Sequence, residues 1–304
     1  MTGHRRAIAM AILVTVLWSS SWVIIRFGLD DEGLDPITFA GLRYAVAALI
    51  LMALVGMRPT ARANFRGLHR AEVGRLAVLG LVFYTLAQGA QFVALDHQPA
   101  ATTSLVLAMT PLAVAALSGR SIGEHATRSQ LSGAILVAAG AVAYFSGSLE
   151  ATMVGMIAAI VGFGSTVVGA VLGRAVNREV HTMPLVTSAV SMVIGAAVLL
   201  SIGLITEGMP EVSARGALVI GWLAVVNTAF AFTLWNASLR HLTASESSLL
   251  NNTMLVQIAL LAWVFLDETP SPAQVIGIVA VSAGVVWSQR RRPSGSLSAA
   301  SGIR

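Results

Sequence analysis

The hydrophobic positions of this chain are grouped into long runs, separated by short segments that carry nearly all of the charges. A segment at residues 36–57 contains the single charge Arg43, and nine further runs contain no Asp, Glu, Lys or Arg. These runs are residues 7–25, 76–95, 97–119, 129–149, 151–173, 182–206, 216–239, 247–266 and 269–289. Each is about 20 residues long, enough for a helix to cross the hydrocarbon core of a bilayer. The pattern predicts an all-α integral membrane protein with ten transmembrane helices.

The first run follows Arg5 and Arg6, as the hydrophobic part of a signal peptide would. It is long for such a segment, and Ser19-Ser20-Ser21-Trp22 does not resemble a small-residue cleavage site. We therefore expect a retained first span.

The composition supports a membrane protein. Hydrophobic residues make up 56% of the chain and charged residues only 11%, against roughly 25% charged in an ordinary soluble domain. These values argue against a soluble globular protein and against a disordered chain. The chain has no cysteine, which excludes disulfides, thiolate metal sites and cysteine nucleophiles. We expect no metal site and no cofactor.

The distribution of the arginines predicts the orientation in the membrane. The net charge of +5 would also suit a nucleic-acid-binding protein. With ten spans, however, sixteen arginines fall on one side: Arg5, Arg6, Arg58, Arg62, Arg66, Arg70, Arg75, Arg120, Arg128, Arg174, Arg178, Arg240, Arg290, Arg291, Arg292 and Arg304. Positive residues mark the cytoplasmic side. We therefore expect both termini in the cytoplasm of a bacterium, a chain embedded in the inner membrane, and no nucleic-acid partner.

The second half of the sequence repeats the first at an offset of 144 residues. The offset pairs His97 with His241, Ser104 with Ser248, Glu124 with Glu268, Gln130 with Gln274 and Gly133 with Gly277. We predict a first five-helix repeat at 1–149, a second at 150–288 and a cytoplasmic basic tail at 289–304. An odd number of spans inverts the second repeat, as in many secondary transporters, whose substrate site lies near the midplane between the halves.

Glycines seven residues apart recur in both repeats, as in the pairs Gly133 with Gly140 and Gly277 with Gly284, and in Gly155, Gly162 and Gly169. Seven residues are about two helical turns, so each set lies on one helix face. Small residues allow membrane helices to approach closely, and we interpret all of these glycines as helix-packing positions.

Several short motifs carry a resemblance to a known family. They are Leu17-Trp18-Ser19-Ser20-Ser21-Trp22, Pro36, Arg43-Tyr44, and a pattern that occurs twice. Its first copy is Ala100-Ala101-Thr102-Thr103-Ser104-Leu105 with Pro111, Gly123-Glu124 and Gly133, and its second is Ala244-Ser245-Glu246-Ser247-Ser248-Leu249 with Asp267-Glu268 and Gly277. Over essentially its whole length the chain resembles the EamA family of the drug/metabolite transporter superfamily. The second copy departs from the pattern, because Leu255 or Val256 replaces the usual mid-span proline.

Polar and aromatic residues at membrane depth are the candidates for substrate contacts, because an unpaired polar group in the bilayer is costly. The candidate substrate-binding residues are Trp18, Trp22, Arg43, Tyr84, Gln88, Gln91, Thr103, Phe163, Asn227, Trp235, Asn252 and Gln257. The alternative for a single Asn or Gln is a hydrogen bond between helices. Trp22 and Trp235 would also fit an aromatic belt at the membrane interface.

Two residues have more specific predicted roles. Arg43 lies about 10 Å into the membrane from Pro36; it would meet a substrate carboxylate or, alternatively, extend toward the acidic segment 30–35. Pro111 is predicted to kink the fourth span.

The resemblance implies a transporter that exports small metabolites by alternating access, with amino acids and related compounds as the favoured substrates. Aromatic walls formed by Trp18, Trp22, Tyr84 and Phe163 would suit aromatic or apolar amino acids. The alternative cargo is a toxic organic cation or drug, with proton coupling. We favour a facilitator, because the predicted spans contain no acidic residue. A membrane-embedded enzyme is a remote alternative, since the spans also lack a catalytic set. The sequence leaves the oligomeric state open.

Overall fold

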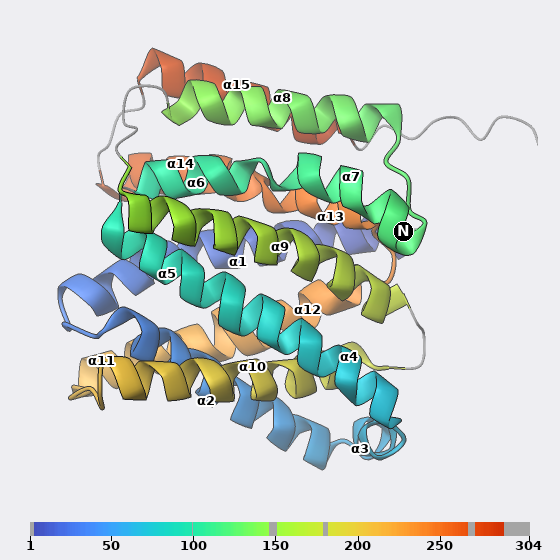
Figure 1. Cartoon of the computed structure of the whole chain (residues 1–304), viewed down its shortest axis with the longest axis vertical. Helices are drawn as coiled ribbons and strands as arrows, with labels where there is room; N and C mark the ends of the chain where they lie inside the picture. Colours follow the sequence, from blue (N-terminus) through green and yellow to red (C-terminus); the bar gives the residue numbers. More distant parts are fainter. Residues whose placement is uncertain (1–2, 99, 146–150, 179–181, 267–270, 289–304) are drawn as a thin grey trace, which may run out of the picture.

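The computed structural model describes residues 3–98, 100–145, 151–178, 182–266 and 271–288 (Figure 1). Every element within these ranges is a helix, which confirms the predicted all-α fold. The predicted tail at 289–304 and the predicted repeat boundary at 149–150 lie outside the described residues.

The helices follow the predicted spans. The first half contains α1 (Gly3–Asp30), α2 (Pro36–Met57), α3 (Pro59–Arg66), α4 (Arg70–Gly80), η1 (Leu81–Leu86), α5 (Ala87–His97), α6 (Ala100–Ala108), α7 (Thr110–Ile122) and α8 (Arg128–Phe145). The second contains α9 (Met153–Arg178), α10 (Pro184–Thr206), α11 (Ala214–Trp222), η2 (Leu223–Phe230), α12 (Ala231–Ser238), α13 (Ala244–Asn251), α14 (Thr253–Leu266) and α15 (Pro272–Ser288). Five described helices are long and apolar enough to cross a membrane: 36–57, 70–94, 153–178, 184–206 and 214–238.

The same two departures from a regular α-helix occur in both halves. The third and eighth spans each contain a π-helical stretch, η1 and η2. The fourth and ninth spans are each interrupted near their middle, at Met109 between α6 and α7 and at Asn252 between α13 and α14. Pro111 explains the first interruption, because proline has no backbone N–H to donate and its ring clashes with the preceding turn.

The second interruption forms without a proline. Instead, the side chain of Asn252 donates its amide Nδ2 to the carbonyl oxygen of Ser248, at 3.2 Å. A side chain that competes for backbone carbonyls in this way weakens the helix at that point. The two halves therefore reach the same shape from different residues.

Each helix contact from the first half to the second has a counterpart from the second half to the first. α1 packs against α12, and α9 packs in the same way against α5. α2 packs against α10, and α8 packs against α15, forming the bottom and top layers in Figure 1. The beginning of α1 and the end of α9 both reach the segment 239–246, so these two helices run in opposite directions. Inverted repeats predict this arrangement.

Close glycine contacts hold the outer pairs together, as the glycine spacing predicted. A Cβ atom added to Gly133 would lie 2.6 Å from the carbonyl oxygen of Gly284, and one added to Gly277 would lie 2.6 Å from that of Gly140. Any larger side chain would separate α8 from α15. The helix-packing interpretation is confirmed for these glycines.

The connections between helices form two opposite faces, at the right and left of Figure 1. We call the first the basic face; it carries the start of α1 and the segments 58–69, 120–127 and 239–243, with most of the described arginines. We call the second the acidic face; it carries the segments 31–35 and 207–213. On the acidic face Glu207 accepts hydrogen bonds from the backbone N–H groups of Ile37 and Thr38, at 3.1 and 2.7 Å, and so caps the start of α2.

Candidate functional site

A cavity of about 270 Å³ lies between the two halves of the molecule. Its walls come from α1, α2, the rod formed by α4, η1 and α5, the interrupted fourth and ninth spans, α9 and α12. An apolar cavity of about 150 Å³ is enough to hold a benzene ring. The cavity therefore has room for a small organic molecule with an aromatic or branched apolar part.

Among the described residues that line the cavity, Arg43 is the one that carries a charge. Its side chain is only 5% exposed. The Nε atom donates to Thr228 Oγ1 at 2.7 Å, and Nη2 donates to the carbonyl oxygen of Asn227 at 3.5 Å. The guanidinium also lies over the ring of Tyr44, 5.3 Å from its centroid. Among the described residues no carboxylate pairs with it.

The position of Arg43 bears on the two roles predicted for it. The guanidinium is held by η2 and does not extend to the acidic segment. An isolated cation in a low-dielectric site attracts an anion strongly, because water does not screen it. The alternative contact with the acidic segment is therefore not formed, and the contact with a substrate carboxylate stays a prediction.

Aromatic rings form one continuous wall of the cavity. The ring centroid of Trp18 lies 4.8 Å from that of Phe232 and 5.2 Å from that of Trp235. Tyr84 lies 5.1 Å from Phe232 and 5.6 Å from Tyr44. The Trp18 indole Nε1 donates to the carbonyl oxygen of Asn227 at 3.1 Å, the same atom that Arg43 contacts. The aromatic wall and the cation are thus adjacent.

The structure brings seven of the predicted site residues together at this cavity. They are Trp18, Arg43, Tyr84, Gln88, Gln91, Trp235 and Asn252. The role of each as a substrate contact stays a prediction. The side chain of Trp22 lies outside the described part of the structure.

Four predicted site residues lie elsewhere. Thr103 is buried and accepts a hydrogen bond from Gln98 Nε2 at 3.0 Å, and Phe163 packs against a cluster that includes Val167. Asn227 donates from Nδ2 to the carbonyl oxygen of Leu17 at 2.5 Å. The Asn227 bond joins η2 to α1, the cluster around Phe163 also contains Val114 of α7, and the Thr103 bond is local. The structure therefore favours a packing role for the three side chains.

Gln257 links α14 to α1. Its Nε2 donates to Thr15 Oγ1 at 3.1 Å, and its Oε1 accepts from Ser19 Oγ at 2.9 Å. With Thr253 these residues form a hydrogen-bonded cluster between the two helices. The helix-linking alternative is therefore favoured for Gln257 as well.

Sequence reasoning omitted several residues that line the cavity. Phe232 lies at the centre of the aromatic wall, but within its apolar run no signal separates it from a lipid-facing phenylalanine. Thr166 and Ser248 are also in the wall. The packing of the helices decides which side of each helix faces the cavity. The residue pattern of a single span does not contain that information.

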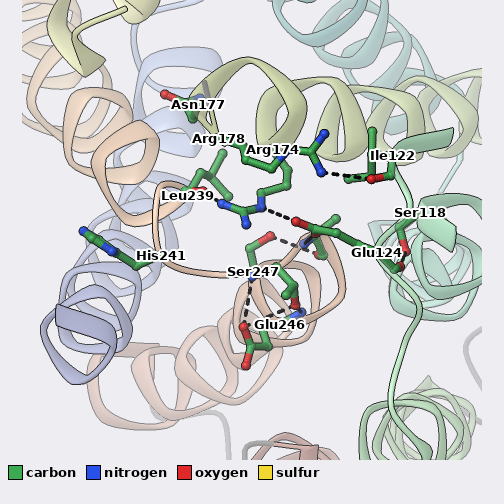
Figure 2. Close-up of polar contacts among 12 residues, drawn as sticks. Ser118, Ile122, Glu124, Arg174, Asn177, Arg178, Leu239, His241, Glu246 and Ser247 are labelled. Atoms are coloured by element: carbon green, nitrogen blue, oxygen red, sulfur yellow. Dashed lines mark hydrogen bonds and ion pairs between the residues drawn. The ribbon is translucent and has the colours of Figure 1, made fainter. Parts of the chain in front are cut away.

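A cluster of polar contacts ties the two halves together at the basic end of the cavity (Figure 2). Arg174 donates from Nε to Glu124 Oε1 at 2.7 Å and from Nη1 to the carbonyl oxygen of Leu239 at 2.5 Å. Glu124 Oε2 accepts from the backbone N–H of Ala244 at 3.1 Å. We call Glu124, Arg174, Leu239 and Ala244 the basic-face clasp.

The clasp is continuous with the cavity wall. Leu239 is both a member of the clasp and a lining residue, and Gly173, next to Arg174, also lines the cavity. Nearby, Arg178 donates to the carbonyl oxygen of Ile122 at 2.9 Å. On the same face, partial burial lowers the pKa of Arg240 from its ordinary value. Within the described ranges, no group of three or more His, Asp or Glu side chains gathers closely enough to hold a metal ion.

The sequence matches the model of the EamA-like transporter family twice, at residues 5–146 and 153–289. It is 26% identical over 295 residues to a protein of Streptantibioticus cattleyicolor named "Probable terminal-alkyne amino-acid exporter", covering 94% of each chain. It is 26% identical over 298 residues to an Escherichia coli protein named "Probable amino-acid metabolite efflux pump", covering 92% of this chain and 94% of the other. An uncharacterised inner membrane transporter of Escherichia coli is 26% identical over 235 residues, covering 75% of this chain and 72% of that one.

A solved crystal structure has a similar fold. It superimposes with a TM-score of 0.77 and covers 93% of this chain and 96% of its own, at 19% sequence identity. At that identity the likeness shows the shared fold alone.

Proposed function

This chain belongs to the EamA-like transporter family and is a multi-pass membrane transporter, and from its cavity we propose that it exports zwitterionic amino acids, aromatic or apolar ones in particular. One relative is named as a probable amino-acid exporter and another as a probable amino-acid metabolite efflux pump. The observation that carries the proposal is Arg43, a buried cation at a cavity whose other described lining residues are uncharged. The substrate carboxylate is the anion that completes this site.

The aromatic wall defines the rest of the proposed substrate. Trp18, Tyr84, Phe232 and Trp235 offer broad apolar faces beside the guanidinium. Aromatic pairs add specific ring contacts to the burial of apolar area. A carboxylate next to a large apolar side chain matches this combination, as in phenylalanine or leucine.

The alternative cargo, an organic cation, is less compatible with the same site. Aromatic rings bind cations, but a second positive charge beside Arg43 would be repelled in a cavity of low dielectric constant. Arg43 therefore favours the amino acid over the cation.

We further propose that the carrier is a facilitator that moves its substrate down the substrate's own gradient. Coupling to protons requires a group in the pathway whose charge changes during the cycle, and the lining residues that the structure describes include no Asp, Glu or His. Proteoliposomes with equal phenylalanine on both sides should therefore show no net accumulation after an imposed pH step. Accumulation that a protonophore abolishes would contradict the facilitator.

The proposed location is the bacterial inner membrane, with the basic face in the cytoplasm, because arginine-rich connections stay on that side. A reporter fused after Arg62, on the basic face, should show cytoplasmic activity. A reporter fused after Asp31, on the acidic face, should show periplasmic activity. The same sidedness at both positions would contradict this topology.

A further inference from the structure

The short helix α3 lies at the basic face, at the edge of the molecule. Figure 1 shows it nearly end-on, whereas α2 runs across the picture between the two faces. Arg58 has an extended backbone and Pro59 follows it, so α2 ends there and the chain turns before α3 begins. The axis of α3 is therefore parallel to the membrane plane, at the depth where the bilayer meets water.

One side of α3 is fixed against the rest of the protein. Ala61 is buried, and Asn64 Oδ1 accepts a hydrogen bond from the backbone N–H of Met183 at 2.9 Å. Met183 directly precedes α10, so this bond joins the first half of the molecule to the second. These contacts decide which side of α3 is left for the surroundings.

The outer side of α3 is positively charged. Arg62 and Arg66 are four residues apart and so lie on one helix face. Exposed arginines continue the same spacing on either side of them, and we call the set the arginine stripe: Arg58, Arg62, Arg66 and Arg70. Within the described ranges no carboxylate pairs with any member of the stripe. The stripe is therefore an unneutralised row of guanidinium groups.

Exposed apolar side chains border the arginine stripe. Phe65 is 38% exposed, and Met57, the last residue of α2, is 77% exposed. Arginines on one face of a helix, with an aromatic side chain beside them, are typical of helices that lie in a membrane interface. There the charges meet lipid headgroups, and the apolar groups enter the boundary of the acyl region. The residues around α3 fit this environment better than they fit water.

We infer that the arginine stripe is a docking surface for the phosphate headgroups of anionic phospholipids in the leaflet at the basic face. The planar fork of a guanidinium group matches the oxygens of a phosphate. A cluster of basic residues next to a membrane span attracts anionic lipids, by about fivefold in affinity for each arginine near the surface. Bound lipids hold α3, and through Asn64 the start of α10, at the membrane surface. The stripe lies outside the cavity wall, so this docking is independent of the substrate.

The test measures thermal stabilisation of the purified full chain, in dodecyl maltoside micelles, by added lipid. Dioleoylphosphatidylglycerol is the anionic probe and dioleoylphosphatidylcholine is the zwitterionic one. The variant combines Arg62→Gln with Arg66→Gln, and a second variant, Arg62→Lys with Arg66→Lys, keeps both charges. The matched control combines Arg5→Gln with Arg128→Gln, which removes two exposed arginines from separate segments at the same end of the molecule.

Wild type should be stabilised by phosphatidylglycerol more than by phosphatidylcholine. The glutamine variant should weaken the apparent affinity for phosphatidylglycerol about 25-fold, which is about fivefold for each arginine. The control and the lysine variant should each stay within about fivefold of wild type, because the stripe keeps its charge in both. An equal loss in the control, or a loss in the lysine variant as large as in the glutamine variant, would overturn the docking surface.

Two measurements on wild type alone also test the lipid surface. The preference for phosphatidylglycerol should disappear in about 1 M sodium chloride, where attraction between exposed charges is screened. Soluble glycerol phosphate, which has the phosphate without the acyl chains, should not stabilise the protein. A preference that persists in high salt would contradict docking by charge, and stabilisation by glycerol phosphate equal to that by the lipid would contradict docking to a membrane surface.

Discussion

Replacing Arg43 by Gln should lower the uptake of phenylalanine at low concentration about 100-fold. A buried charge that loses its charged partner costs about 2–5 kcal/mol, and each 1.4 kcal/mol is a factor of about ten in affinity. Glutamine keeps a polar head that still reaches toward Thr228, the present partner of Nε at 2.7 Å, but it removes the charge. The measurement is initial uptake into proteoliposomes over a range of phenylalanine concentrations.

The controls separate carboxylate binding from packing. Arg43→Lys keeps the charge and should retain part of the activity, although it loses the planar fork that suits a carboxylate. Binding of phenethylamine, which has no carboxylate, should be as strong in Arg43→Gln as in wild type, or stronger. An equal loss for phenylalanine and phenethylamine would show that Arg43 only holds α2 against η2.

Replacing Glu124 by Gln should open the basic end of the cavity. Glu124 lies in the first half and accepts from Arg174 and from the N–H of Ala244 in the second half. The side chains of Arg174 and Glu124 are only 12% and 14% exposed, so removing one charge leaves the other poorly solvated. We expect a shift of about 2 kcal/mol toward the state that is open on the basic face, which is about thirtyfold in the equilibrium.

Thiol labelling measures this opening, because the chain contains no cysteine of its own. Ser247→Cys places one thiol in the cavity wall next to the basic-face clasp. A membrane-impermeant thiol reagent added on the basic side should label this position at least tenfold faster when Glu124→Gln is also present. The matched control is Arg178→Gln, which removes an exposed arginine that donates to the carbonyl oxygen of Ile122 in the same cluster. This variant should change the labelling rate little. Unchanged labelling in the Glu124 variant would mean that the clasp does not close the cavity.

The sequence predicted the helical spans well, because crossing a bilayer forces long uncharged runs that can be counted directly. It also predicted the interruption at Pro111, since a proline within a span has few other outcomes. The matching interruption at Asn252 was not predicted. It depends on one side-chain amide that competes for the carbonyl of Ser248, and many asparagines in helices do not do so.

The depth of a residue in the membrane did not predict whether its side chain lines the cavity or packs between helices. Trp18 and Gln257 were both predicted as substrate-binding residues at membrane depth. Trp18 lines the cavity, whereas Gln257 forms hydrogen bonds with Thr15 and Ser19. Trp18 lies on α1 and Gln257 on α14, and these two helices pack against each other. Only the rotation of each helix separates a lining residue from a packing residue. That rotation depends on contacts between segments far apart in the sequence, such as the hydrogen bond between Gln257 and Thr15.

Counterflow in proteoliposomes measures the proposed transport of zwitterionic amino acids most directly. Vesicles loaded with unlabelled phenylalanine are diluted into a trace of labelled phenylalanine, with no pH gradient and no membrane potential. We predict a transient accumulation of label inside the vesicles that saturates with the internal concentration and is lost in Arg43→Gln. No accumulation with phenylalanine or leucine, together with accumulation driven by an organic cation, would contradict an amino-acid carrier built around Arg43.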